Sequence, residues 1–424
     1  MRRAVAGAVV ALLLSGNAFG RELAGGGEEG GEAWLTLRSA LHGSTLIFRA
    51  PEDPLLFPET VSGTSFWRLR FEPEAKPTAW LTLSLAYEQS LLTGSSSTGL
   101  GATGFGVLPS EARAPYRVTP LEGTIAGDGT RLAWRQGLDR AFVKAHHPIA
   151  DLTVGRQAIG WGRGVLFNAV DLFPPFTPLE YDREWRRGVD AIRVETAFSE
   201  HASMDTVAAF GERLEESVYA ARLRGYLGKV DAELVGGWRA GDWVVGASAS
   251  AAVGGMELHG ELATFYLPEP WYEPELFDNP RWVPKAVLGG SYQIGVAGGI
   301  RLLAEYHYSG FGISRPDELL ERLADPAIQK RYLRGDTQIL GRHALALVAS
   351  WQALPTLGVS ATWLQDPVDG SGLAAPTLNW DFSEKVTLIG GVYASYGRRP
   401  VALSVGSQFG YVPLTGIVQV RIYD

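Results

Sequence analysis

The stretch IRLLAEYHYSG, residues 300–310, alternates between apolar and polar side chains with a period of two. Successive side chains of a β-strand point to opposite faces, so this period fits a strand. One face would carry Ile300, Leu302, Ala304, Tyr306 and Tyr308, and the other would carry Arg301, Glu305 and His307. The stretch therefore predicts a strand with one apolar and one charged face.

The same alternation recurs along the chain in segments of about ten residues. Its polar faces hold further ionisable side chains: Arg68 and Arg70 in FWRLRFE (66–72), Arg222 and Arg224 in SVYAARLRGYL (217–227), and Glu257, His259 and Glu261 in MELHGEL (256–262). The pattern predicts 18 strands, near residues 33–42, 64–72, 78–90, 135–146, 150–158, 187–198, 203–211, 217–227, 231–239, 242–252, 256–267, 284–294, 299–309, 342–353, 357–365, 375–381, 385–396 and 414–424. A typical hairpin of about 50 residues gives 16 strands for this length, so we expect 16–18.

Two architectures produce such strands, a soluble sandwich with its apolar faces inside and a membrane barrel with its apolar faces outside. Three features favour the barrel. The strands are near the length that a tilted membrane strand needs. Four aromatic residues fall near predicted strand ends on the apolar face, where an interfacial girdle lies: Tyr87, Tyr308, Trp351 and Trp363. Short connections such as 73–77 and 381–385 alternate with long ones such as 91–130 and 159–186.

The sequence therefore predicts an all-β fold, a transmembrane antiparallel β-barrel with short periplasmic turns and long extracellular loops. The polar faces of the strands would line the lumen. The lumen-facing residues would be Arg68, Arg70, Arg222, Arg224, Glu257, His259, Glu261, Arg301, Glu305 and His307.

The amino terminus, MRRAVAGAVVALLLSGNAFG, has a basic head, a short apolar run and small residues before Arg21. These are the marks of a secretory signal peptide over residues 1–20, cleaved near Gly20. Residues 21–32 are rich in Gly and Glu and predict a flexible leader. Residues 33–424 would form a single barrel.

The formal net charge of −8 disfavours nucleic acid as a partner, since such binding depends on neutralising phosphates.

The signal peptide, the strands AEYHYSGFG and GRHALALVASW, the GRQ…WGRG…RRGVDAIRVE run and the last strand resemble those of bacterial outer-membrane porin-like β-barrels. Alginate-export-like barrels are one candidate subfamily. The resemblance implies the outer membrane of a Gram-negative-type bacterium. It also implies outer-membrane lipid, the assembly machinery and small hydrophilic solutes as partners. Such barrels commonly end on an aromatic residue, whereas this chain ends Tyr423-Asp424.

The long connection 159–186 carries several large apolar side chains and the stiffening residues Pro174, Pro175 and Pro178. These apolar side chains need a surface to bury against, so we expect the loop to fold inward and narrow the lumen; the alternative is a loop that caps the barrel outside. The charged residues at the constriction would be Arg163, Asp171, Asp182, Arg183, Glu184, Arg186 and Arg187. A helical period over 315–336 predicts a helical segment in another outer loop.

No catalytic, cofactor-binding or metal-binding residue is predicted. The sequence has no cysteine, and the G-x-S-x-G and H-E-x-x-H motifs do not occur. Two G-x-G-x-x-G matches, at 25–30 and 99–104, do not follow a strand and open a helix. His146-His147 falls in a predicted turn. We therefore expect a non-enzymatic channel; the alternatives are a barrel enzyme acting on lipids and a structural or partner-binding barrel.

Overall fold

The computed structural model of the 424-residue chain describes residues 22–24, 34–53, 57, 59–94, 115–127, 131–272, 279–315, 318–401 and 406–424. The predicted signal peptide and most of the predicted leader lie outside these residues. Within the leader, β1 (Glu22–Ala24) pairs antiparallel with Thr36 and Leu35. This short strand was not predicted.

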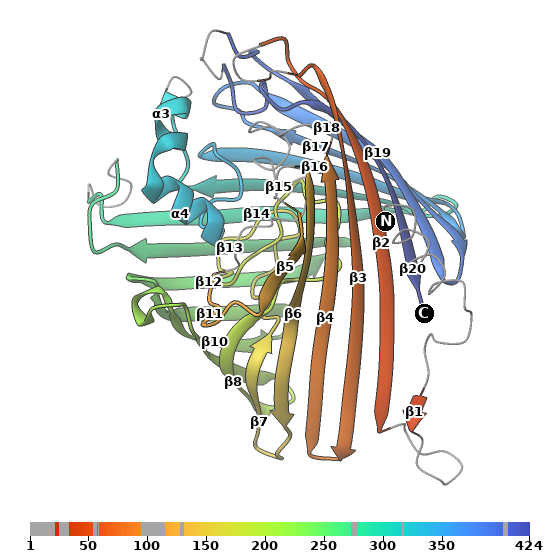
Figure 1. Cartoon of the computed structure of the whole chain (residues 1–424). Coiled ribbons are helices and arrows are strands. Elements are labelled where there is room, and N and C mark those ends of the chain that lie inside the picture. Colours follow the sequence, from red (N-terminus) through yellow and green to blue (C-terminus); the bar gives the residue numbers. More distant parts are fainter. Residues whose placement is uncertain are drawn as a thin grey trace.

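Eighteen antiparallel strands form a closed barrel (Figure 1). Each strand pairs with the next along the chain, and the last strand pairs with the first long one to close the ring. The wall strands are β2 (Leu35–Arg49), β3 (Val61–Thr78), β4 (Leu81–Gly94), β6 (Leu132–Ala145), β7 (Ala150–Gln157), β8 (Val189–Ser199), β9 (Ala202–Ala209), β10 (Val218–Leu227), β11 (Val230–Arg239), β12 (Asp242–Val253), β13 (Met256–Tyr266), β14 (Trp282–Ile294), β15 (Ile300–Ser309), β16 (His343–Leu354), β17 (Leu357–Gln365), β18 (Gly372–Ser383), β19 (Val386–Tyr396) and β20 (Leu414–Tyr423).

The predicted fold class is confirmed, and every predicted strand overlaps one wall strand. The predicted turn at 73–77 is wrong, because these residues belong to β3 and the chain turns at residues 79–80. Pro73 and Pro77 suggested a turn. Pro77 instead falls in an irregularity of the β3–β4 ladder between Ala75 and Thr78, where a residue without an N–H is tolerated.

The wall between β6 and β8 contains a piece of the long connection 91–130. The strand β5 (Glu122–Ala126), which the sequence did not predict, pairs with Trp134–Gly137 on the edge of β6. Closer to β8, the carbonyl of Tyr116 accepts a hydrogen bond from the N–H of Asp190. The eight residues of β7 end below this region, so residues 116–126 complete the wall above them.

The outward face of the strands is apolar. Leu234, Val245, Leu262 and Leu288 are at least 60% exposed, whereas the neighbouring Glu233 and Glu261 are 4% exposed. This is the pattern of a barrel whose outside faces lipid and whose inside is polar.

Aromatic side chains form a row on this outward face near the long loops. Tyr219 stacks on Trp238 with ring centroids 5.8 Å apart, Trp238 is the strand partner of Trp243, and Tyr266 packs on Trp282. Of the predicted girdle residues, Tyr308 and Trp363 lie near the loop-side ends of their strands, and Trp351 lies near the turn-side end of β16.

Tyr87 does not lie at a strand end. It sits in the middle of β4, and its hydroxyl donates to Gln136 at 2.7 Å. The prediction misplaced it because β4 continues beyond the predicted strand to Gly94.

The predicted helical segment 315–336 contains two helices, α3 (Leu319–Ala324) and α4 (Pro326–Arg334). Pro326 interrupts the period, and Asp325 caps α4 by accepting the N–H of Ala327. In the described part of the chain, no helix combines the length and apolarity needed to cross a membrane.

Candidate lumen site

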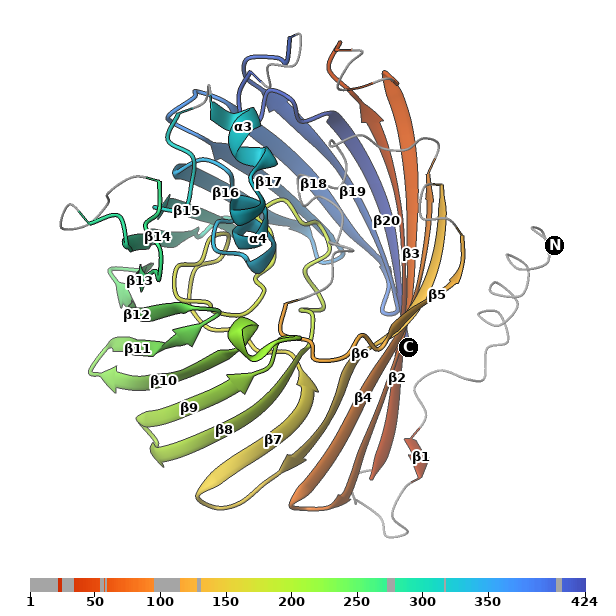
Figure 2. The same cartoon turned by 60° about the vertical axis from the view of Figure 1, so that its left-hand side comes forward.

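The connection between β7 and β8, residues 158–188, runs inside the ring of strands (Figure 2). It contributes to two apolar clusters. Leu166, Phe167 and Leu179 belong to one cluster with inward side chains of β2, β3, β14 and β16–β20. Trp161, Leu172 and Phe173 belong to another with those of β8–β14. Phe167, Leu172 and Phe173 are completely buried. Each such burial contributes about 1.5–3 kcal/mol, which favours the inward position over a solvent-exposed one.

Two carboxylates on the wall bind the backbone of this segment. Glu305 accepts the N–H groups of Val165, Leu166 and Phe167 at 2.6, 2.9 and 3.1 Å. The carboxylate of Glu261 accepts four more, from Arg163, Gly164, Ala169 and Val170. Hydrogen bonds to an ionised acceptor are stronger than neutral ones, so these two residues fix the path of residues 163–170.

The other predicted lumen residues lie on the same inward face. His259 contacts Glu305 at 2.9 Å, and His307 stacks on Phe167 with ring centroids 4.9 Å apart. The remaining contacts are Arg222 with Asp205 and Glu233, Arg224 with Asp231, Arg301 with Glu257, and Arg70 with Glu72, Glu88 and Asp139.

The segment is tied to the first and last wall strands near its end. Asp182 lies 2.9 Å from Nδ1 of His42 on β2 and 3.4 Å from Arg421 on β20. Glu184 lies 3.3 Å from Nε2 of His42 and also binds Arg421 and Tyr423. Burial by itself would raise the pKa of Asp182. His42, Arg68 and Arg421 outweigh burial and lower this pKa to about 2.

The atoms of His42, Asp182 and Glu184 lie close enough together to ligate one metal ion. Arg421, however, already bonds to both carboxylates. The guanidinium therefore supplies part of the positive charge that an ion would bring to the two carboxylates.

Six of the seven predicted constriction residues are engaged in contacts that hold the segment together. Besides Asp182 and Glu184, Arg163 pairs with Asp231 and Glu233, and Arg186 pairs with Asp171. Arg183 donates to the backbone carbonyls of Thr177, Pro178 and Glu180. The seventh, Arg187, lines a cavity.

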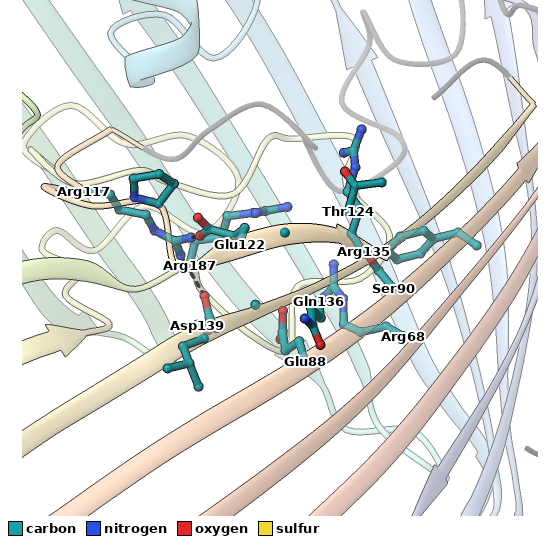
Figure 3. Close-up of a pocket in the computed structure, with 15 residues that line it drawn as sticks. Arg68, Glu88, Ser90, Arg117, Glu122, Thr124, Arg135, Gln136, Asp139 and Arg187 are labelled. Carbon is teal, nitrogen blue, oxygen red and sulfur yellow. Dashed lines mark hydrogen bonds and ion pairs between the residues drawn. The ribbon is translucent and has the colours of Figure 1, made fainter. Parts of the chain in front are cut away.

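This cavity has a volume of about 420 Å³ and lies where the segment leaves the wall uncovered (Figure 3). Its walls are β3, β4 and β6 on one side and residues 117–124 on the other. The charged lining residues are Arg68, Arg117, Arg135, Arg187, Glu88, Glu122 and Asp139. The cavity is the polar space beside the inserted segment.

The pKa of Arg187 is lowered by burial and by the positive charges of Arg68 and Arg117, with Glu88 and Asp139 acting in the opposite direction. Burial and the two arginines prevail. The charged form of Arg187 is therefore disfavoured, mainly because its side chain is buried.

The sequence did not single out Glu88, Arg117, Arg135 or Asp139 as site residues. Glu88 could have been found, because it continues the polar face of the predicted strand 78–90. Arg117 could not, because it lies in a long connection without a periodic pattern, and its contacts with Gly188 and Asp139 join residues 71 and 22 positions apart.

No family model matches the sequence, and no curated protein is similar to it. Solved structures are similar in fold. OccAB3 of Acinetobacter baumannii superposes with a TM-score of 0.51 and 10% identity over 92% of this chain and 99% of the other. OccAB1 of the same species superposes with a TM-score of 0.55 and 7% identity over 92% and 96%. These neighbours are bacterial outer-membrane porins.

The chain has a porin-like fold. At this level of identity the likeness extends to the architecture of the barrel, and the function rests on the chain's own residues.

Proposed function

We propose that the protein is an outer-membrane channel for the passive or weakly selective passage of small hydrophilic solutes. The observation that carries this proposal is the polar cavity beside the inserted segment. Residues 158–188 cover the inner wall of most strands with apolar contacts, and the wall of β3, β4 and β6 stays polar and open. A narrowed, charged lumen is the arrangement that selects solutes by size and charge.

The proposed location is the outer membrane of a Gram-negative-type bacterium, reached after cleavage near Gly20 with the help of the assembly machinery. The apolar outside of the barrel and its aromatic row support contact with lipid. Intact mass spectrometry of the membrane-extracted protein should give a chain that starts at Arg21. A full-length mass in the membrane fraction would contradict this maturation.

Planar-bilayer recording of the purified protein tests the channel directly. We expect discrete conductance steps in potassium chloride. A silent membrane, with insertion verified by protease protection in vesicles, would rule out the channel.

A second candidate function, hydrolysis of a lipid ester, has one observation in its favour. The hydroxyl of Thr82 lies 3.1 Å from Nε2 of His146, and Nδ1 of His146 lies 3.3 Å from Asp151. A hydroxyl, an imidazole and a carboxylate in this order can act as nucleophile, base and orienting group. Lys144 also binds Asp151, at 2.9 Å, and Thr82 does not line the cavity, so we favour the channel. Phospholipid hydrolysis that disappears in His146→Ala would favour the enzyme.

A further inference from the structure

One ring nitrogen of His42, on β2, has no hydrogen-bond partner. The residue is 1% exposed, and its Nδ1 lies 2.9 Å from a carboxylate oxygen of Asp182 in the inserted segment. Nε2 is also buried, and no described residue forms a hydrogen bond with it. In the neutral ring the carboxylate keeps the proton on Nδ1, so Nε2 presents a lone pair. Buried polar atoms rarely stay without a partner, and an imidazole lone pair suits a metal ion.

A carboxylate oxygen of Glu184 lies 3.3 Å from this nitrogen. Two ligands at about 2.0–2.1 Å from a tetrahedral Zn²⁺ ion are themselves about 3.3 Å apart. In that geometry the second ligand stands roughly 35° to the side of the direction in which Nε2 points. It therefore comes close to the nitrogen without being aligned for a hydrogen bond. His42 and Glu184 are close and are not hydrogen-bonded, as two ligands of one ion would be.

Asp182 and two aromatic rings hold the imidazole in this orientation. The ring of His42 stacks on Trp185 with centroids 4.2 Å apart and meets the ring of Tyr423 edge-on at 5.7 Å. A histidine that binds a metal commonly donates its other N–H to a carboxylate, which fixes the ring and makes its lone pair more basic. Asp182, which is 2% exposed, has this position. The imidazole is thus oriented before an ion arrives.

The positive charges nearby leave Glu184 only weakly paired. Arg68 and Arg421 both stabilise the charged form of Asp182. Arg421 reaches Glu184 at 3.5 Å, which is longer than the roughly 2.7–2.9 Å of a strong charged hydrogen bond. The other partner of Glu184, the hydroxyl of Tyr423, is neutral. The side chain of Glu184 is 29% exposed, so ions and water in the lumen can reach it.

We propose that His42 and Glu184 are ligands of a divalent transition-metal ion of the Zn²⁺ type, and that Asp182 is a positioning residue for the imidazole. The nitrogen ligand favours Zn²⁺ over Mg²⁺ and Ca²⁺, which prefer oxygen alone. Water from the lumen completes the four-coordinate shell. Because His42 belongs to the wall and Glu184 to the inserted segment, the ion joins the two. This site does not depend on the proposed channel function.

Calorimetric titration of Zn²⁺ tests the site on the full-length protein, purified in detergent, treated with EDTA and dialysed. We expect one equivalent of Zn²⁺ to bind, and Mg²⁺ not to bind under the same conditions. Co²⁺ reports the geometry, because a tetrahedral Co²⁺ site absorbs visible light much more strongly than the six-coordinate aqueous ion. Co²⁺ should produce this absorption, and added Zn²⁺ should abolish it. The absence of Zn²⁺ binding would overturn the inference and leave His42 as an ion-pair partner of two carboxylates.

Variants assign the roles. His42→Gln and Glu184→Gln each remove a ligand and should weaken Zn²⁺ binding by about 100-fold or more, beyond the roughly 10–100-fold typical of residues that only support a ligand. Asp182→Asn should keep one equivalent, with binding weaker by about 10–100-fold. It should also shift the Co²⁺ absorption, because the imidazole becomes a less basic ligand. An unshifted absorption in Asp182→Asn would contradict its positioning role.

His146→Gln is the matched control. His146 also lies 3.3 Å from a carboxylate, that of Asp151, but both side chains are about one-third exposed and lie at a turn. We expect Zn²⁺ binding to be unchanged in this variant. Loss of the equivalent in His146→Gln, with retention in His42→Gln, would place the metal at the turn and overturn the inference. All variants are first shown to be folded by their mobility on an unheated denaturing gel; Glu184→Gln, which keeps the shape of the side chain, decides the question should His42→Gln fail to fold.

Discussion

At the scale of single residues, the inner wall uses carboxylates to hold a backbone. Glu305 accepts three backbone N–H groups of the inserted segment, and Glu261 accepts four. A polar loop interior would otherwise bury these donors without partners, at a cost of about 1–3 kcal/mol each. The two glutamates therefore make it possible for an irregular segment to lie in the middle of a barrel.

Replacement of Glu305 by Gln should loosen the segment. The neutral amide is a weaker acceptor, and its NH₂ group would face N–H donors, so docking should lose about 1–3 kcal/mol. We expect a larger and noisier single-channel conductance, measured in planar bilayers. Glu257→Gln is the control, because Glu257 is exposed and contacts only side chains, those of Arg301 and Ser291. Equal conductance changes in both variants would contradict the anchoring role of Glu305.

Glu180 gives the segment a dependence on pH. Burial raises the pKa of this carboxyl from 4.5 to about 7, against the effect of the Thr177 N–H and of nearby arginines. The pKa of Glu180 is higher in the folded state than in the unfolded state, so the protonated carboxyl contributes to the stability of the fold. This contribution is fully present below pH 4.5 and is lost as the pH rises through 7. Glu180→Gln should therefore stabilise the protein by roughly 3 kcal/mol at pH 8 and hardly at pH 4. The temperature at which the gel band of the folded protein disappears measures the stability at each pH. Stabilisation by Glu180→Gln at pH 4 alone would contradict the expected direction of the effect.

Arg187 and Arg186 should differ in their effect on ion selectivity, although they are neighbours. Arg187 lines the cavity, whereas Arg186 is bound to Asp171 and to the carbonyl of Pro174. Arg187→Ala should shift the zero-current potential toward cation preference, by less than about twofold in permeability ratio at 0.1 M salt and more at lower salt. Arg186→Ala should shift it less. The reverse order would place the ion path on the other side of the segment.

At the scale of elements, α4 is held over the barrel by a buried group of charges. Asp336 follows the helix and is completely buried, and it pairs with Arg239 of β11 and with Arg331 and Arg334 of α4. Burial raises the pKa of Asp336, but the three arginines lower it well below its ordinary value. One carboxylate thus connects the outer loop to the wall.

Asp336→Asn should release this loop, because it leaves buried guanidinium groups without their counter-charge, at a cost of about 3–5 kcal/mol. We expect faster cleavage by trypsin within 315–336, followed by mass spectrometry, while the barrel keeps its gel mobility. Asp325→Asn is the control, because asparagine caps a helix as well as aspartate does. Unchanged cleavage in Asp336→Asn would show that apolar contacts alone hold α4.

The elements themselves were largely predictable, since each wall strand exposes alternate side chains to two different environments and so carries a period of two. The exceptions have no such period. All five residues of β5 are exposed, and the break at Pro326 interrupts an otherwise continuous helical pattern. The partners of the inserted segment were not predictable. His42 and Asp182, for example, are 140 positions apart, and sequence spacing carries no information about such a pair.

At the scale of the whole molecule, the closed ring leaves no free edge among the wall strands from which the sheet could unravel. The unheated protein in mild detergent should therefore migrate differently from the boiled protein on a denaturing gel. The comparison needs no variant, and soluble sandwich proteins of similar mass serve as the control. Identical mobility before and after boiling would contradict a closed barrel.

The ties at the end of the inserted segment also set an order of events in biogenesis. Asp182 and Glu184 contact β2 and β20 at once, and these strands come from opposite ends of the chain. The full set of contacts exists only after β20 has paired with β2. Docking of the segment is thus a late step that follows closure of the ring, and a chain stalled before its final strand is inserted would still carry an unlatched segment, open to proteases.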